Sequence, residues 1–296
     1  MKLKHWLVFI LLGAIWSSSF MWIKIAVKET GPVTLVAFRV LFGLLFGIAV
    51  IIIQRTRLPK DFKSWSPLFL LGITNIALPF FLISWGEQTI DSAVAAILDA
   101  TVPLFTIVIA HYSLKDDKIS IQKLLGLLTG FAGVALLLSK DIDSPAGSIL
   151  GQAAVILASV LYAWSGVYVR KRTVDTPGIL RSAGPLVSAT AVMWLAVLTT
   201  ERPVVLPHLS ITWIALLFLG IIGSGFAFFL AFYLIHEIGP SRTSMVTYIF
   251  PLGGVILGAA FLHEDITWQV FAGGALIIIS LAVTNKKPVE KPAGRN

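Results

Sequence analysis

The chain has 296 residues, of which 57% are hydrophobic and 13% charged, with a mean hydropathy of +0.89. A soluble domain carries about 25% charged residues, so most of this surface does not face water. The absence of cysteine excludes disulfides, thiol chemistry and cysteine metal sites. The net charge of +8 could suggest nucleic acid, but no basic patch with interleaved aromatic residues occurs, and we expect no nucleic-acid partner.

Ten long apolar stretches are each predicted to form a helix that crosses a lipid bilayer. A helix needs about 20 apolar residues to do so, and only helices or closed barrels satisfy their backbone hydrogen bonds in lipid. Barrel strands are short and alternating, whereas these stretches are continuous. In chain order they cover residues 6–23, 35–53, 64–86, 92–113, 124–139, 144–169, 182–200, 211–235, 243–262 and 266–285. The second and fourth include one charged residue each, Arg39 and Asp99.

The distribution of positive charge predicts how the chain is oriented. If the N-terminus is cytoplasmic, eighteen Lys and Arg residues fall on the cytoplasmic side and four on the outer side. Cytoplasmic loops of membrane proteins carry such an excess of positive charge. We therefore expect both termini in the cytoplasm. The Pro- and charge-rich tail, residues 286–296, is predicted to be disordered.

The two halves of the chain repeat each other at an offset of 148 residues as far as Asp117/Asp265, and of 147 residues after one deletion. Each half has five predicted spans, and an odd number forces the second copy to insert upside down. The predicted fold is therefore an all-α integral membrane protein with ten transmembrane helices as two inverted five-helix repeats, residues 6–139 and 147–285. Inverted repeats are typical of secondary transporters, which hold their site between the halves. The matching pairs include Trp16/Trp164, Gly72/Gly220, Phe80/Phe228 and Pro103/Pro251.

Four segments together resemble a known family. They are residues 13–20 in the first span, Arg39 in the second, residues 93–105 in the fourth and residues 126–133 in the fifth. Through these segments, the chain resembles EamA-type members of the drug/metabolite transporter superfamily, and the resemblance covers residues 6–284. The resemblance implies a carrier of the bacterial cytoplasmic (inner) membrane, often an exporter of amino acids or related small metabolites. Asp99 departs from the family pattern, which has a neutral or amide residue there, and this argues against a simple uncharged cavity.

Three charged residues are predicted to lie at similar depth in the membrane: Lys24, Arg39 and Asp99. Charges there are rare and usually paired or facing a cavity. We expect Asp99 to pair with Arg39 or with Lys24, either to bind substrate charge or a proton, or only to fix helix packing. Lys24 could instead extend its ammonium group to the surface. Glu87, at the outer end of the third span, is expected to be a solvated loop residue.

Aromatic and small polar residues in the middle of the spans are candidates for lining a substrate path. Aromatic walls with a few hydrogen-bonding groups suit small amphipathic ligands, although the same residues also serve in packing. The predicted substrate-binding residues are Trp16, Ser19, Asn75, Asp99, Tyr162, Trp164 and Tyr248.

Proline and glycine positions predict bends and close packing. Pro103 and Pro251 lie at equivalent places in the repeats, and each removes one helical hydrogen bond, so they are predicted to be hinges or static bends. With Arg39 and Lys24 they form the predicted structural or gating set. Glycines spaced four residues apart are typical of closely packed helices. We expect this packing within a monomer more than at a dimer interface, and a dimer stays the alternative.

An enzyme is not expected, and neither is a metal or a cofactor. His236-Glu237 and His263-Glu264 lack the second histidine of a zinc-protease motif, and Asp99 has no second intramembrane aspartate. No phosphate-binding loop is present, so ATP does not drive the protein directly. The sequence predicts a secondary transporter whose partners are a small-molecule metabolite and membrane lipids, an exporter that works by alternating access. An importer or a lipid or polyamine flippase of the same fold is the alternative.

Overall fold

The computed structural model describes residues 2–56, 58–59, 61–114, 119–139, 146–173, 176–201, 206–238 and 243–284. Within these ranges every element is a helix. The predicted disordered tail lies outside the described residues. The elements are α1 (Leu3–Ala26), α2 (Pro32–Ile53), α3 (Phe62–Leu71), η1 (Gly72–Ala77), α4 (Leu78–Gly86), α5 (Ser92–Asp99), α6 (Val102–Ser113), α7 (Ile121–Ser139), α8 (Ala146–Arg172), α9 (Gly178–Thr200), α10 (Ser210–Leu217), η2 (Phe218–Phe226), α11 (Ala227–Ile238), η3 (Ser244–Tyr248), α13 (Ile249–Leu262) and α14 (Trp268–Thr284).

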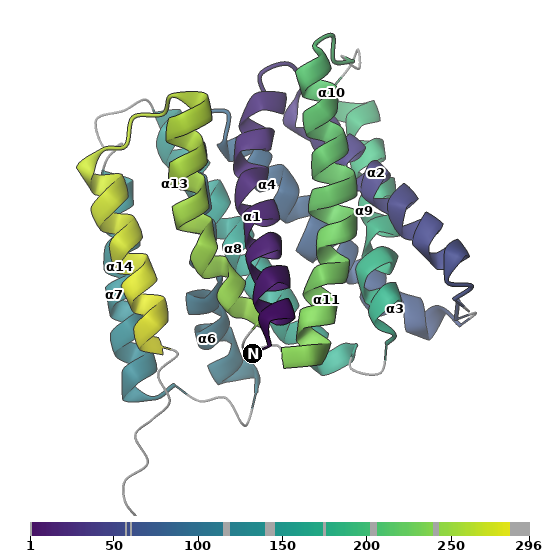
Figure 1. Ribbon diagram of the computed structural model, residues 1–296, viewed down its shortest axis with the longest axis horizontal. Helices are drawn as coiled ribbons and strands as arrows, with labels where there is room; N and C mark the ends of the chain where they lie inside the picture. The colour runs from purple at the N-terminus through teal and green to yellow at the C-terminus, as the bar shows by residue number, and fades with distance from the viewer. Residues whose placement is uncertain are drawn as a thin grey trace, which may run out of the picture.

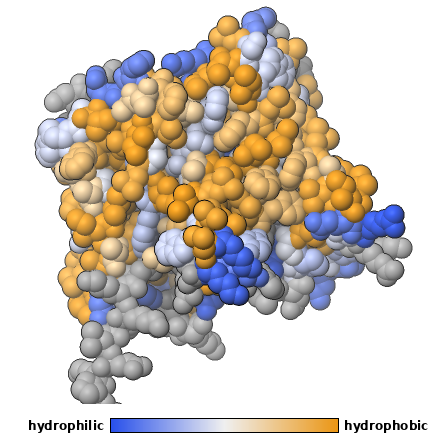
Figure 2. Space-filling model, in the orientation of Figure 1, coloured by the Kyte–Doolittle hydropathy of each residue, from blue (hydrophilic) through white to orange (hydrophobic). Residues whose placement is uncertain are grey.

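These helices have the lengths and the surface of a membrane protein. In the described part of the chain, nine helical stretches are long and apolar enough to cross a membrane, and α14 contributes a shorter apolar helix. Figure 2 shows apolar side chains covering most of the visible face, with hydrophilic ones gathered near its edges. Large apolar side chains are exposed in this way on α9 and α14, such as Leu195 and Phe271. The predicted all-helical fold of two inverted five-helix repeats is confirmed.

The two repeats agree in local detail. The indole Nε1 of Trp65 donates a hydrogen bond to the carbonyl of Pro59 at 2.9 Å, and that of Trp213 donates to the carbonyl of Pro207 at 3.0 Å. The two tryptophans and the two prolines are each 148 residues apart. The same contact therefore fixes the start of α3 and of α10.

A π-helical segment interrupts the third span of each repeat. The η1 segment, Gly72–Ala77, corresponds at the 148-residue offset to residues 220–225, which lie within η2, Phe218–Phe226. π-Helical turns are rare in proteins, and those that do occur are often at functional sites. They bring two glycines close to neighbouring backbone: Gly72 faces the carbonyl of Pro185 on α9, and Gly220 faces that of Arg39 on α2.

Helices of one repeat pack mainly against helices of the other. α2 contacts α9 and η2, α4 contacts α8, and α13 contacts both α1 and α5. α7 and α14, the last helices of the two repeats, lie side by side at one edge of the molecule (Figure 1). The remaining helices therefore surround a common interior that belongs to both repeats.

The fourth span of each repeat changes its helical geometry at a matched position. α5 ends at Asp99 and α6 begins at Val102, while the ninth span starts as the 3-10 helix η3 and becomes α-helical at Ile249. Pro103 cannot donate a hydrogen bond to the carbonyl of Asp99, and Pro251 cannot donate to that of Thr247, because proline has no N–H. Thr247 is the repeat counterpart of Asp99. The hinge role of the prolines stays a prediction.

Candidate functional site

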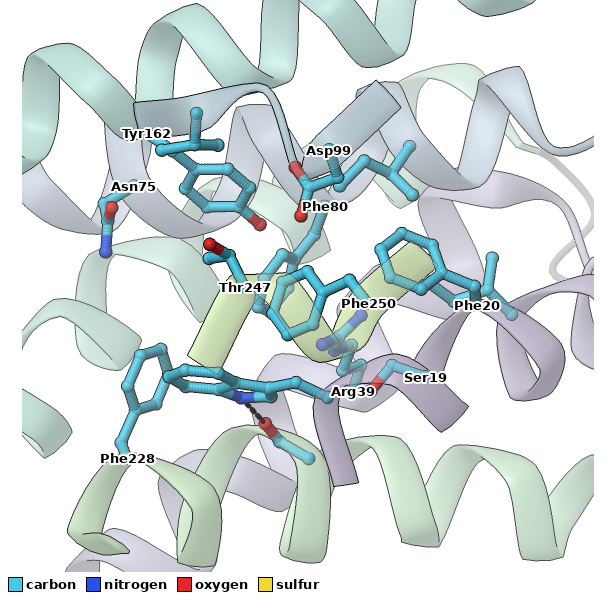
Figure 3. Close-up of a pocket in the computed structure, with 15 residues that line it drawn as sticks. Ser19, Phe20, Arg39, Asn75, Phe80, Asp99, Tyr162, Phe228, Thr247 and Phe250 are labelled. Carbon is cyan, nitrogen blue, oxygen red and sulfur yellow. Dashed lines mark hydrogen bonds between the residues drawn. The ribbon is translucent and has the colours of Figure 1, made fainter. Parts of the chain in front are cut away.

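A cavity of about 290 Å³ lies at the centre of the molecule, between the repeats. Four pairs of residues that line it are repeat counterparts, 148 residues apart: Asn75/Gly223, Phe80/Phe228, Asp99/Thr247 and Val102/Phe250. Both repeats therefore contribute equivalent backbone positions to its wall. Trp16, Ser19, Phe20, Ile23, Arg39, Ile83 and Tyr162 complete the lining (Figure 3).

The polar groups of the cavity converge on its middle. The side chains of Asp99, Tyr162 and Thr247 point towards one another in Figure 3. Asp99 is buried, and Oγ of Ser159 lies 3.5 Å from its Oδ1, which is long for an O–H···O hydrogen bond. The Ser159 hydroxyl also lies 3.1 Å from the carbonyl oxygen of Val155. The Asp99 carboxyl group is thus held loosely and can accept a ligand.

Arg39 supplies the positive charge of the cavity. Its Nε donates to Oγ of Ser224 at 3.0 Å, and its guanidinium carbon lies 3.7 Å from the centre of the Phe80 ring. A guanidinium has five N–H donors, so this contact leaves the terminal nitrogens for other partners. Stacking on an aromatic face and one hydrogen bond fix the orientation of the buried cation.

The expected ion pair of Asp99 is not formed. Among the described residues, the ion pairs within 4.0 Å are those of Glu237 with Lys4 and His5. Arg39 is instead held by Ser224 and Phe80. The ammonium group of Lys24 donates to two backbone carbonyls in the α4–α5 connection, at 2.7 Å each. Both cations therefore have partners that the sequence did not suggest.

Aromatic rings form the opposite wall. The Trp16 ring meets the rings of Phe228 and Phe250 edge-on, with centroids 6.1 and 6.3 Å apart, and Phe20 meets Phe250 at 6.2 Å. Edge-to-face contacts of this kind are favourable beyond the area they bury. The Nε1 of Trp16 donates to the carbonyl of Gly223 in the π-helical segment, at 3.2 Å. This bond fixes the indole plane against the cavity.

The structure brings most of the predicted residues together and separates two from the rest. Trp16, Ser19, Asn75, Asp99, Tyr162 and Arg39 all line the cavity. Trp164 stacks on Tyr168 with centroids 5.1 Å apart and is 37% exposed, outside the lining. The Tyr248 hydroxyl donates to the carbonyl of Leu281 at 2.6 Å, also outside it.

Several lining residues were not predicted, although one signal pointed to some of them. Phe80 and Phe228 are identical residues at matched positions of the repeat, and matched positions near a pseudo-twofold axis are where a shared site would lie. Thr247 is the direct counterpart of Asp99, whereas Tyr248, the residue predicted instead, follows it. No feature of the sequence pointed to Gly223 as a backbone acceptor.

The cavity is closed at one end. We call the end of the molecule where α1 begins the N-terminal side and the opposite end the far side. Ile23 and Ile83, the lining residues nearest the far side, are buried, whereas Asn75, Phe228 and Thr247, nearer the N-terminal side, are partly exposed. In this conformation the cavity therefore has its more accessible wall towards the N-terminal side.

Carboxylates on the far side bind the first backbone N–H groups of helices. Glu201 accepts from the N–H groups of Val33 and Thr34 at 3.1 and 2.8 Å, and Glu264 accepts from those of Ser92 and Ala93 at 2.7 and 3.0 Å. Helix N-termini have unpaired N–H groups and a partial positive charge. These contacts join α9 to α2 and the α13–α14 connection to α5.

A third carboxylate joins two far-side loops. Glu29 in the α1–α2 connection accepts from the backbone N–H groups of His208 and Leu209, just before α10. A hydrogen bond from Thr212 is the main cause that lowers the pKa of Glu29 below its ordinary value, and the backbone N–H groups add to it. The carboxylate therefore stays charged at neutral pH, and the far side is held closed by several such contacts.

A helical membrane protein with two inverted repeats around a central cavity that is closed at one end has the architecture of a transporter. Residues 4–139 and 149–286 match the EamA-like transporter family, and the chain belongs to this family. It is a multi-pass membrane protein and a transporter. The family assignment made from the sequence is confirmed.

Relatives named as transporters match nearly the full chain. The uncharacterized transporter YoaV of Bacillus subtilis is 25% identical over 273 residues, covering 89% of this chain and 90% of its own. The uncharacterized inner membrane transporter YedA of Escherichia coli is 26% identical over 274 residues, covering 91% of this chain and 87% of its own. A solved crystal structure has the same fold, with a TM-score of 0.68 at 20% identity, covering 96% of this chain and 98% of that one.

Proposed function

We propose that the protein exports amino acids, or closely related small zwitterionic metabolites, from the cytoplasm by alternating access. The observation that carries the proposal is the central cavity, which places the Asp99 carboxyl group and the Arg39 guanidinium in one chamber with aromatic walls. The chemistry is that of a binding protein and carrier, not that of an enzyme.

The two charges suit the two ends of a zwitterion. An Arg guanidinium binds a carboxylate through paired N–H donors, and Arg39 retains terminal nitrogens after bonding to Ser224. Asp99 can bind an ammonium group. The volume of about 290 Å³ lies at the lower limit of pockets for drug-sized ligands, roughly 300 Å³, which favours a small metabolite.

The direction rests on the orientation of the chain. The excess of Lys and Arg residues favours a cytoplasmic N-terminal side, and the accessible wall of the cavity faces that side. A cavity in this state would load substrate from the cytoplasm.

The repeat offers a matched pair of variants that tests the site. Trp16→Ala should raise the apparent KM for transport up to about tenfold, because an aromatic contact is worth about 0.5–1.5 kcal/mol and 1.4 kcal/mol corresponds to tenfold. Trp164→Ala, at the matched position but outside the cavity, should leave KM unchanged. The measurement is counterflow of labelled amino acids in liposomes, with no ATP present. Equal effects of the two variants would contradict this site.

Single cysteines test the orientation, because the chain has none of its own. Lys63 and Gln88 are both exposed and lie at opposite ends of the third span. In intact cells, a membrane-impermeant maleimide should label Gln88→Cys and should reach Lys63→Cys only after the membrane is permeabilised. The reverse pattern would place the N-terminal side outside and reverse the proposed direction of loading.

A further inference from the structure

A second carboxyl group, Glu87, lies inside the protein away from the cavity lining. It follows directly on α4 and was expected to be a solvated loop residue, but the structure corrects this expectation, since Glu87 is completely buried. Neither of its carboxylate oxygens has a hydrogen-bond partner. The hydroxyl of Ser84, one turn earlier on the same helix, is also buried without a partner.

The charged groups around Glu87 do not neutralise it. Lys24 on α1 is the cation that acts most strongly on Glu87. Its ammonium group, however, donates to the backbone carbonyls of Glu87 and Ile90, and it makes no ion pair within 4.0 Å of a carboxylate among the described residues. Arg39 on α2 is held by Ser224 and Phe80. Glu264, from the α13–α14 connection, has the same sign as Glu87.

The remaining elements packed against α4 supply no further cation beside Glu87, and the α4–α5 connection adds another acid, Asp91. α8 is the main helix packed against α4. Its first charged residue is Arg170, which lies near the C-terminus of the helix, on the N-terminal side of the molecule. The η1 segment has none, and on α5 the charged side chain is Asp99, also an acid. An ionised carboxylate in such surroundings is costly, and a buried group in this position neutralises instead.

We propose that Glu87 is a proton-binding site, a carboxylic acid that holds one proton while the far side is closed and releases it to water when that side opens. The O–H bond of the acid breaks, the proton goes to water, and the electron pair stays on the carboxylate. The site is separate from Asp99, because Glu87 does not line the cavity.

Lys24 links the proton to the conformation. In the closed state its ammonium group ties α1 to the α4–α5 connection through two carbonyls. Loss of the proton creates a carboxylate that competes for the same ammonium group, and this removes one contact that closes the far side. In the proposed orientation the far side faces the outside, so the proton would exchange with external water; only this assignment rests on the proposed function.

Infrared spectroscopy of the purified protein in nanodiscs tests the proton site without any substrate. At pH 7 the unmodified protein should show the absorption of a protonated carboxylic acid. Glu87→Gln should lose the part of the band that comes from Glu87, whereas Asp99→Asn, the control at the acid in the cavity, should keep that part. Glu87→Asp should shift the band if the variant folds. Absence of the band from the unmodified protein, or an unchanged band in Glu87→Gln, would overturn the proposal.

Thermal unfolding against pH gives an independent readout. A folded state that holds a proton which the unfolded chain releases becomes less stable as pH rises, starting near pH 4.3 where a free glutamate titrates. The folding constant should fall by up to about tenfold per pH unit. Glu87→Gln should flatten this slope; an equal slope in both proteins would contradict the site. A transport failure with these results intact would count against the export function alone.

Discussion

Asp99→Asn is expected to raise the substrate concentration for half-maximal transport by about 10–100-fold. Asp99 is the carboxylate that lines the cavity in the described structure, with Tyr162 and Thr247 beside it. A hydrogen bond to a charged group is worth about 1.5–3 kcal/mol, and each 1.4 kcal/mol corresponds to tenfold. Liposome uptake of a labelled amino acid measures the effect.

Tyr248→Phe is the matched control for Asp99→Asn. Tyr248 is adjacent to the repeat counterpart of Asp99, but its hydroxyl bonds to Leu281 outside the cavity. The variant should lose about 0.5–1.5 kcal/mol of stability with the hydrogen bond and keep its KM. A normal KM in Asp99→Asn, with normal folding, would show that the carboxylate does not contact the substrate.

Gly72→Ala is expected to destabilise the fold strongly. A Cβ at this position would overlap the hydroxyl of Ser188 and the backbone carbonyl of Pro185 on α9. A backbone oxygen cannot rotate away, so η1 and α9 must separate. Overpacking of this kind typically costs about 1–3 kcal/mol, and the thermal unfolding temperature in detergent should fall accordingly.

Gly166→Ala provides the comparison for Gly72→Ala. A Cβ on Gly166 would meet nothing within 4 Å, and alanine favours a helix over glycine by up to about 1 kcal/mol. This variant should be as stable as the original protein or slightly more so. Comparable destabilisation in both variants would mean that the close approach of η1 to α9 does not hold the helices together.

The architecture could be predicted from the sequence because it depends on hydropathy and on an internal repeat. The repeat even predicts contacts: Trp65 and Trp213 make the same hydrogen bond to prolines six residues earlier. The offset relates Asn75 to Gly223 in the cavity lining as well. A repeat preserves backbone positions best, and these positions form the core of the site.

Side-chain partners could not be read in the same way. Trp16 and Trp164 are matched in sequence, yet one bonds to Gly223 in the cavity wall and the other stacks on Tyr168. The outcome depends on neighbours that differ between the repeats, such as Phe228 beside Trp16. Equivalent backbone positions do not imply equivalent surroundings.

Electrostatic contacts were hidden for a different reason. Glu201 accepts a hydrogen bond from the backbone N–H group of Val33, 168 residues away. Every residue except proline has a backbone N–H group, so the sequence does not indicate which one a carboxylate will bind. Lys24 likewise binds carbonyls instead of a carboxylate. Glu87 was expected to be a solvated loop residue because it lies at the outer end of the third span, whereas packing around the α4–α5 connection buries it. The π-helical segments have no hydropathy signal.

The interleaved packing of the repeats has a consequence for biosynthesis. α2 packs against α9 and η2, and α7 packs against α14, the last helix of the second repeat. During translation, the first five spans are therefore inserted before their packing partners exist. Their small-residue faces contact lipid until the second repeat has been synthesised and inserted. Neither half should persist alone in the cell, whereas halves co-expressed as separate chains, divided between α7 and α8, should rescue each other from degradation.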